Sequence, residues 1–122
     1  MTDTFQLYQQ HLATPSDIQH HLPLLFSLAR GNVLELGTRS GVSTAALLAG
    51  VEKSGGTVIS IDIEDCSQVA TGHPQWTFIQ GDSCNSELTA QVNTPFDLLL
   101  IDTFHTYEQS TAELSLWGLL VR

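Results

Sequence analysis

Two glycines, Gly37 and Gly41, lie between a short β-rich run, residues 33–36, and a stretch of helical character that starts near Ser40. Glycine lets the backbone adopt positive φ angles and approach a bound molecule closely. Free backbone N–H groups at the start of the following helix would face the same molecule. In α/β proteins such a turn lies at the carboxyl edge of the sheet, where ligands bind. Residues 37–41 are therefore the first candidate for a binding loop.

The glycine spacing separates this loop from the common nucleotide-binding loops. Counted from Gly37, both the dinucleotide pattern and the P-loop require a glycine at position 42, which is Val42. What remains is Glu35-x-Gly37-x-x-x-Gly41, which resembles motif I of class I S-adenosylmethionine-dependent methyltransferases. The resemblance implies that Glu35, Gly37, Thr38 and Gly41 bind this cofactor. A glycine turn that serves only tight packing is the alternative.

Acidic residues follow the next two predicted strands. Asp62 ends a strand about twenty residues beyond the loop, where a carboxylate can accept both hydroxyls of a ribose. Glu64 would take its place if the strand ended later. Asp82 and Ser83 follow the third strand, and in the methyltransferases that this chain resembles an acid there often meets the adenine amino group. Asp82 could equally be the N-cap of a helix.

The most distinctive segment is residues 96–108, which reads FDLLLIDTFHTYE. Together with Glu113 and Trp117 behind it, it resembles the IDGxHxYE…DxxxW…LL signature of a group of small-molecule methyltransferases. That group includes macrocin O-methyltransferase and the cephalosporin-hydroxylase-type proteins. Thr103 replaces the usual glycine, and Glu113 stands where aspartate is commoner. The resemblance extends over residues 30–122.

In that group the acid that ends the fourth strand and the histidine after it face the methyl donor. The resemblance therefore makes Asp102 and His105 the catalytic candidates, and Asp102 a candidate ligand for a divalent metal such as Mg²⁺. His105 could instead cap or hydrogen-bond the turn. The implied cofactor is S-adenosylmethionine, and the implied reaction is methyl transfer to an oxygen of a small-molecule substrate, a step dominated by orientation.

Alternating strands and helices must position these residues. The β-rich runs are residues 33–36, 57–62, 76–80 and 96–102, and the helical stretches are 40–53, a weak one near Ser67, 83–91, and Tyr107 to the end. Such alternation predicts an α/β fold, a Rossmann-like doubly wound parallel sheet with four strands. The apolar run from Leu98 to Ile101 does not alternate, which predicts a strand covered on both faces.

Helical spacing of apolar residues in the first thirty positions predicts two helices before the sheet. Thr14 suits the N-cap of the second helix, and Gly31 suits its end. We therefore expect a single domain over residues 1–122. It comprises a helical segment, 1–30, and a cofactor-binding α/β half, 31–122.

Composition and charge exclude several classes of function. Thirteen acidic residues stand against four scattered basic ones, for a formal net charge of −9. Binding to phosphates needs clustered cations, so nucleic acid and anionic membranes are poor candidate partners. Cys66 and Cys84 form neither a CxxC motif nor a zinc set, and the N-terminus lacks the features of a secretory signal. We expect a cytoplasmic protein with reduced thiols.

In the resembled fold a fifth strand pairs with the fourth, and this chain stops before it. The residues that complete a metal site in the resembled group lie beyond that strand. We therefore expect cofactor binding with weak or absent catalysis, and a non-catalytic binding or interaction module is the alternative. An open edge at the fourth strand, and a final helix that is apolar nearly all round and carries Trp117, also predict a homodimer.

Overall fold

Four parallel strands form one sheet in the part of the chain that the structure describes. The computed structural model describes residues 4–15, 19–92, 95–102, 107–118 and 121. The strands are β1 (Gly31–Leu36), β2 (Gly56–Asp62), β3 (Trp76–Gln80) and β4 (Leu98–Ile101), in the order β3-β2-β1-β4. The chain therefore adds β2 and then β3 on one side of β1, and β4 on the other side of β1. This is the predicted doubly wound sheet, with a topological switch point between β1 and β4.

The register brings the carboxyl ends of the strands to one edge. Leu36 of β1 lies opposite Ile61 of β2 and Ile101 of β4, and Asp62 lies opposite Gln80 of β3. The residues that directly follow these positions share one end of the sheet. Polar residues from four separate parts of the sequence can therefore meet there.

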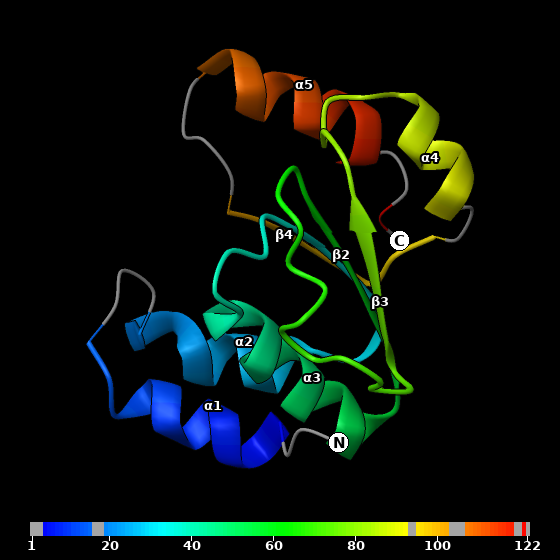
Figure 1. Cartoon of the computed structure of the whole chain (residues 1–122). Helices are drawn as coiled ribbons and strands as arrows, with labels where there is room; N and C mark the ends of the chain where they lie inside the picture. The colour runs from blue at the N-terminus through cyan, green and yellow to red at the C-terminus, as the bar shows by residue number, and fades with distance from the viewer. Residues whose placement is uncertain (1–3, 16–18, 93–94, 103–106, 119–120, 122) are drawn as a thin grey trace.

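Helices cover both faces of this sheet (Figure 1). On one side lie α1 (Thr4–Leu12), a 3₁₀ turn (Gln19–His21), α2 (Leu22–Leu28) and α3 (Val42–Ser54), and on the other lie α4 (Glu87–Val92) and α5 (Tyr107–Trp117). Both α1 and α2 pack against α3, which also contacts β1 and β2. Residues 43–51 of α3 are all buried. The helix has no polar face because it is covered by helices on one side and by the sheet on the other.

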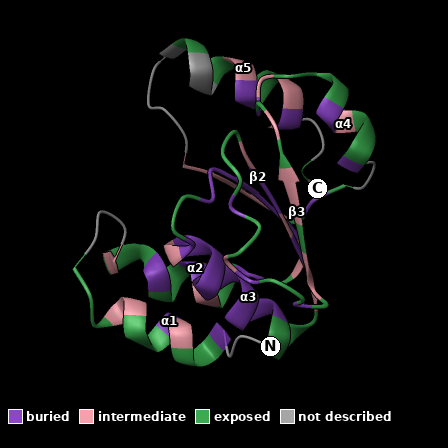
Figure 2. Ribbon diagram, viewed as in Figure 1, coloured by how far each residue is buried: buried purple, intermediate pink, exposed green. Residues whose placement is uncertain are grey.

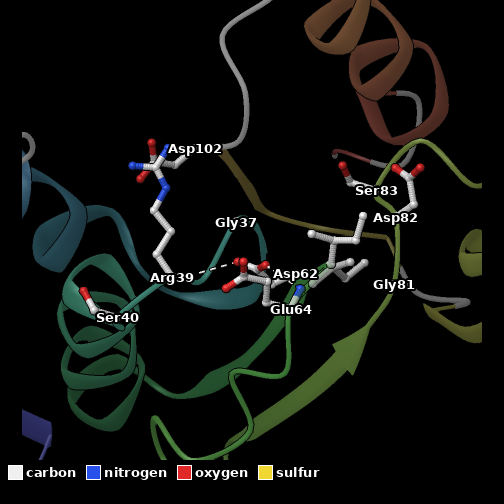
Figure 3. Close-up of a pocket in the computed structure, with 11 residues that line it drawn as sticks. Gly37, Arg39, Ser40, Asp62, Glu64, Gly81, Asp82, Ser83 and Asp102 are labelled. Carbon is white, nitrogen blue, oxygen red and sulfur yellow. Dashed lines mark hydrogen bonds between the residues drawn. The ribbon is translucent and has the colours of Figure 1, made fainter.

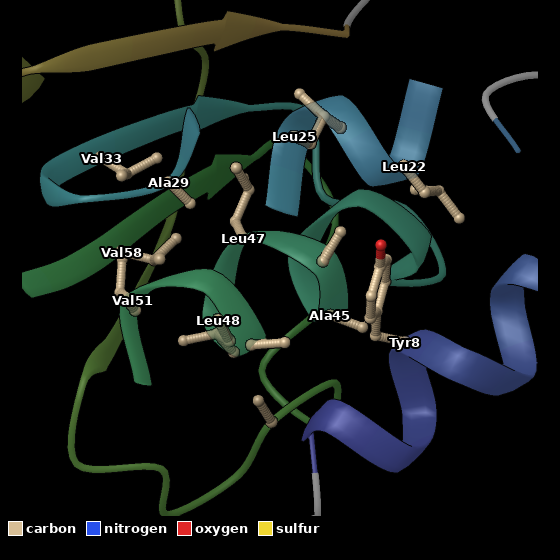
Figure 4. Close-up of a cluster of buried hydrophobic side chains, with 13 residues drawn as sticks. Tyr8, Leu22, Leu25, Ala29, Val33, Ala45, Leu47, Leu48, Val51 and Val58 are labelled. Carbon is tan, nitrogen blue, oxygen red and sulfur yellow. The ribbon is translucent and has the colours of Figure 1, made fainter. Parts of the chain in front are cut away.

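Strand side chains alternate between two apolar clusters, one on each face. Val33 and Val58 join the cluster under α1, α2 and α3 (Figure 4), while Leu34, Leu36 and Trp117 belong to the cluster under α4 and α5. Figure 2 shows the buried residues along the strands and α3. In β4, alternate residues contact the two clusters, so the prediction that both faces are covered is confirmed. Full burial of one such side chain contributes about 1.5–3 kcal/mol.

The predicted boundaries of the second helix were wrong. The Thr14 hydroxyl donates to the carbonyl of Gln10 at 2.9 Å, so Thr14 closes the end of α1. The next helix begins only at Leu22, after the turn Gln19–His21. Gly31 does not end that helix, because it is the first residue of β1.

Later boundaries also differ from the predictions. Residues 67–72 form turns where a weak helix was predicted, and α4 begins at Glu87, inside the predicted range. The final helix ends at Trp117, and Val121 forms a parallel bridge with Phe96 beside the start of β4. Among the described residues, no helix is both long and apolar enough to cross a membrane.

Candidate functional site

A cavity of about 630 Å³ opens at the carboxyl edge of the sheet (Figure 3). Its volume is typical of small-molecule sites. Four segments line it, namely Gly37, Arg39 and Ser40 after β1, residues 61–64 at the end of β2, residues 81–83 after β3, and Asp102 after β4. The cavity therefore lies at the edge where the strand order reverses, the usual place for a ligand in this kind of sheet.

The sequence-predicted site residues divide into three groups. Those that line the cavity are Gly37, Asp62, Asp82, Ser83 and Asp102. Glu35, Thr38 and Gly41 do not line it, although all three belong to β1 or to the loop that follows. His105 lies outside the described residues.

The loop after β1 depends on unusual backbone angles. Gly37, Arg39 and Gly41 have φ values of 95°, 51° and 89°, and glycine adopts such angles without steric cost. A Cβ atom at Gly41 would also lie 2.4 Å from Cγ1 of Val69, so a side chain there would clash. The Gly37 N–H donates to the carbonyl of Ile61 at 2.8 Å. This bond fixes the start of the loop against the end of β2.

The carboxylate of Asp62 holds the same loop from the end of β2. Its Oδ2 atom accepts the backbone N–H groups of Thr38 at 2.8 Å and Arg39 at 3.0 Å. Its Oδ1 atom accepts the N–H of Glu64 at 2.9 Å. Burial alone would raise the pKa of Asp62, but these bonds and one from the Cys66 thiol outweigh burial and lower the pKa. Asp62 is therefore ionised at neutral pH, and its carboxylate holds the loop through these hydrogen bonds.

The loop N–H groups that were expected to face a ligand are mostly used within the protein. Thr38 and Arg39 donate to Asp62, and Gly41 donates to the carbonyl of Thr38 at 3.0 Å. A carboxylate has about four lone-pair sites, so Asp62 has little capacity left for a ligand hydroxyl. The carboxylate of Glu64 lines the cavity beside it (Figure 3). A pair of ligand hydroxyls would therefore meet Glu64 as well as Asp62.

Glu35 lies beneath the loop, between β1 and α3. It is fully buried, and its carboxyl oxygens accept hydrogen bonds from the hydroxyls of Ser43 at 2.5 Å, Thr44 at 2.6 Å and Ser60 at 2.8 Å. Burial raises the pKa of Glu35 to about 7, while the three hydroxyl bonds oppose that rise and the charge of Asp102 adds to it. Glu35 thus ties β1, β2 and the first turn of α3 together, and supports the loop from behind.

The turn after β3 is held by side chains of α5. The Ser83 hydroxyl donates to Oε2 of Glu113 at 2.5 Å, and the Trp117 indole N–H donates to the carbonyl of Ser83 at 2.7 Å. Glu113 and Trp117 are both fully buried. Asp82 is not a helix N-cap, because its Oδ1 accepts the N–H of Cys84 at 2.9 Å and α4 begins further along. Contacts from α5 therefore set this wall of the cavity.

Asp102 reaches the cavity directly from the end of β4. Its backbone N–H donates to the carbonyl of Leu36 at 2.8 Å, which aligns it with the end of β1. Across the described residues, no three His, Cys, Asp or Glu side chains come together in a way that could hold a metal ion. Asp102 brings one carboxylate to this edge, and its assignment as a metal ligand stays a prediction, since His105 lies outside the described residues.

Some site residues were not identified from the sequence. Arg39 and Ile63 line the cavity, and Ile63 is 68% exposed there. Arg39 lies between Gly37 and Gly41, and Ile63 lies between Asp62 and Glu64. These positions in the sequence could have identified both residues. In the described part of the chain, the hydroxyl of Thr38 is the one buried side-chain polar atom without a hydrogen-bond partner. Thr38 is 2% exposed and does not line the cavity.

Comparison with known families identifies a methyltransferase domain. The family model described as a methyltransferase domain matches residues 34–122, a range that contains every residue lining the cavity. No curated protein sequence matches the chain.

Several solved structures share the fold. The MycE methyltransferase from the mycinamycin biosynthetic pathway, in complex with Mg, SAH and mycinamycin VI, has a TM-score of 0.74 and 22% identity, with 99% of this chain and 35% of that chain covered. An O-methyltransferase from Bacillus cereus in complex with SAH has a TM-score of 0.70 and 22% identity, with coverages of 100% and 63%. The SAH-bound Podospora anserina methyltransferase PaMTH1 has a TM-score of 0.68 and 16% identity, with coverages of 100% and 59%. The chain thus spans between about a third and two thirds of these relatives.

Proposed function

Since the chain belongs to the methyltransferase domain family, we propose that its cavity binds S-adenosylmethionine and the product S-adenosylhomocysteine. The observation that carries the proposal is the cavity at the carboxyl edge of the sheet, with the glycine loop on one side and acids after β2 and β3 on the other. Its volume of about 630 Å³ suits a ligand of this size.

The lining residues fit the parts of this cofactor. In our proposal Asp82 accepts a hydrogen bond from the adenine amino group, and Glu64, beside Asp62, accepts most of the bonds from the ribose hydroxyls. Gly37 lets the ligand approach the backbone closely.

We assign the transfer step to the part of the cavity beside Asp102. Bound S-adenosylmethionine supplies a methyl group on a positively charged sulfur. Asp102 would orient a small-molecule hydroxyl and take its proton while the oxygen–methyl bond forms and the sulfur–methyl bond breaks. His105 is the second candidate for this role, on the resemblance alone.

A protein that binds the cofactor without transferring methyl is the second candidate function. It is favoured by the single carboxylate at Asp102 and by the lack of a metal-binding group among the residues that the structure describes. Methyl transfer from labelled S-adenosylmethionine to a catechol or sugar hydroxyl would separate the two functions. If transfer occurs, Asp102→Asn should abolish it and leave cofactor affinity nearly intact.

Calorimetric titration with S-adenosylhomocysteine tests the proposed site. Asp82→Asn should weaken binding about tenfold, since a charge-assisted hydrogen bond is lost. Asp65→Asn is a matched control, because Asp65 lies outside the cavity and accepts a backbone N–H from Ser67 just as Asp82 does from Cys84. It should bind as the parent chain does. Absence of binding to the parent chain at millimolar ligand would contradict the proposal.

We also propose that the chain forms a homodimer and works in the cytoplasm. β4 is an edge strand of the described sheet, and Leu114 on α5 is 56% exposed, so this side has apolar surface to bury. Trp117 does not take part, because it is fully buried within the chain's own core. Cys66 and Cys84 are both free thiols, which is consistent with a reducing compartment.

A further inference from the structure

Acidic side chains outnumber basic ones around the cavity. The carboxylates of Asp62, Glu64, Asp82 and Asp102 line it, and among the described residues Arg39 is the one basic residue that does. The whole chain has four Lys and Arg residues against thirteen acids. An anionic group on a ligand is therefore repelled by most of the cavity and attracted only at Arg39.

The backbone of Arg39 is fixed while its side chain remains exposed. Its φ of 51° and the bond from its N–H to Asp62 anchor it in the glycine loop. From there the side chain extends toward Asp102 (Figure 3). The guanidinium makes no ion pair with any residue that the structure describes. Arg39 thus brings a positive charge to the cavity lining.

Several other donors in this loop are already used, and the Thr38 hydroxyl, which has no partner among the described residues, does not line the cavity. The N–H groups of Gly37 and Thr38 bind Ile61 and Asp62, and the hydroxyls of the first turn of α3 point to Glu35. A planar guanidinium can hold a carboxylate through two parallel hydrogen bonds. Arg39 is therefore the group of this loop best suited to an anionic part of a ligand.

The order of the groups in Figure 3 indicates which part of the cofactor lies there. Asp62 and Glu64 lie between Asp82 on one side and Arg39 with Asp102 on the other. If adenine lies at Asp82 and ribose at Asp62, the amino-acid end lies on the side of Arg39. We infer that Arg39 binds the carboxylate of the cofactor's amino-acid part, an inference that rests on the proposed function. This contact places the sulfur-bound methyl near Asp102.

Two ligands separate this role from a general effect on the site. S-adenosylhomocysteine carries the carboxylate, whereas 5′-deoxy-5′-methylthioadenosine keeps the adenine, ribose and thioether but lacks the amino-acid part. Calorimetry would compare both ligands on the parent chain, Arg39→Met, Arg39→Lys and the control Arg30→Met. Replacing Arg30 removes the same single positive charge as replacing Arg39. Arg30 is exposed and outside the cavity, so this control leaves the site itself unchanged.

The inference expects Arg39→Met to weaken S-adenosylhomocysteine about tenfold and to change the affinity for methylthioadenosine less than twofold. Arg39→Lys should lose less, because it keeps the charge, and Arg30→Met should change neither ligand. Equal weakening of both ligands, or unchanged binding of both, in Arg39→Met would overturn the role of Arg39 while the proposed function stands. Binding of neither ligand to the parent chain would overturn both.

Discussion

Replacing Glu35 by glutamine should remove most of the pH dependence of stability between about pH 5 and pH 8. The carboxyl of Glu35 is fully buried among three hydroxyl groups, and its pKa lies at about 7 instead of 4.5. Glutamine has nearly the same shape and stays neutral. It therefore imitates the protonated form of Glu35 at every pH in this range.

The sign of the effect follows from the raised pKa. Between pH 4.5 and about 7 the folded protein keeps a proton on Glu35 that the unfolded chain has released. The free energy of unfolding is therefore highest at the acid end and falls as pH rises through the folded pKa. At about 1.4 kcal/mol for each pH unit, the rise from 4.5 to about 7 corresponds to a loss of about 3 kcal/mol.

Urea unfolding followed by tryptophan fluorescence at several pH values would measure this loss. The parent chain should lose about 3 kcal/mol between pH 5 and pH 8, and Glu35→Gln should lose little and be the more stable protein at pH 8. His11 has a pKa lowered by burial, which acts with the opposite sign, but it is present in both proteins and cancels in the difference. Glu87→Gln, at an exposed carboxyl, is the control and should keep the slope of the parent chain.

Parallel pH profiles for the parent chain and Glu35→Gln would refute the reasoning. They would mean that the folded protein stabilises the ionised carboxyl of Glu35 as well as water does. In that case the three hydroxyl bonds, and not burial, would dominate its environment.

Two further predictions concern single side chains. Thr38→Val should raise the free energy of unfolding by about 1 kcal/mol, since it removes a buried hydroxyl without a partner among the described residues. A loss of stability in urea unfolding would show that the hydroxyl is paired. Leu114→Glu should convert the proposed dimer to a monomer in sedimentation at micromolar concentration. Leu24→Glu, at an equally exposed leucine (56%) on α2, should leave the dimer intact. A monomeric parent chain would contradict the proposed dimer.

Local patterns in the sequence were sufficient for the main elements and for the loop. The predicted third strand, residues 76–80, matches β3, and the predicted second strand differs from β2 by its first residue. The positive φ angles at Gly37 and Gly41 confirm the expected glycine turn. Each of these features depends on side-chain periodicity or backbone freedom within a few consecutive residues, which a single sequence displays directly.

Local patterns failed at weakly determined helices and helix ends. The weak helix near Ser67 is a series of turns, and Thr14 caps the carbonyl of Gln10 instead of starting a helix. Intrinsic preferences at such positions are worth only fractions of a kcal/mol, so surrounding structure overrides them. The family resemblance pointed to the right fold but carried no information on these boundaries.

The roles of individual site residues were decided only by tertiary structure. The family resemblance marked Glu35 as a cofactor contact, yet burial among three hydroxyls places it beneath the loop. Asp62, marked by its spacing from the loop, lines the cavity but is also engaged by backbone N–H groups of that loop. For Trp117 the sequence left a core or an interface position open, and the structure buries it in the core against Ser83, a residue far away in the sequence. A sequence shows which groups can bond, but which bonds form depends on the partners that folding brings within about 3 Å.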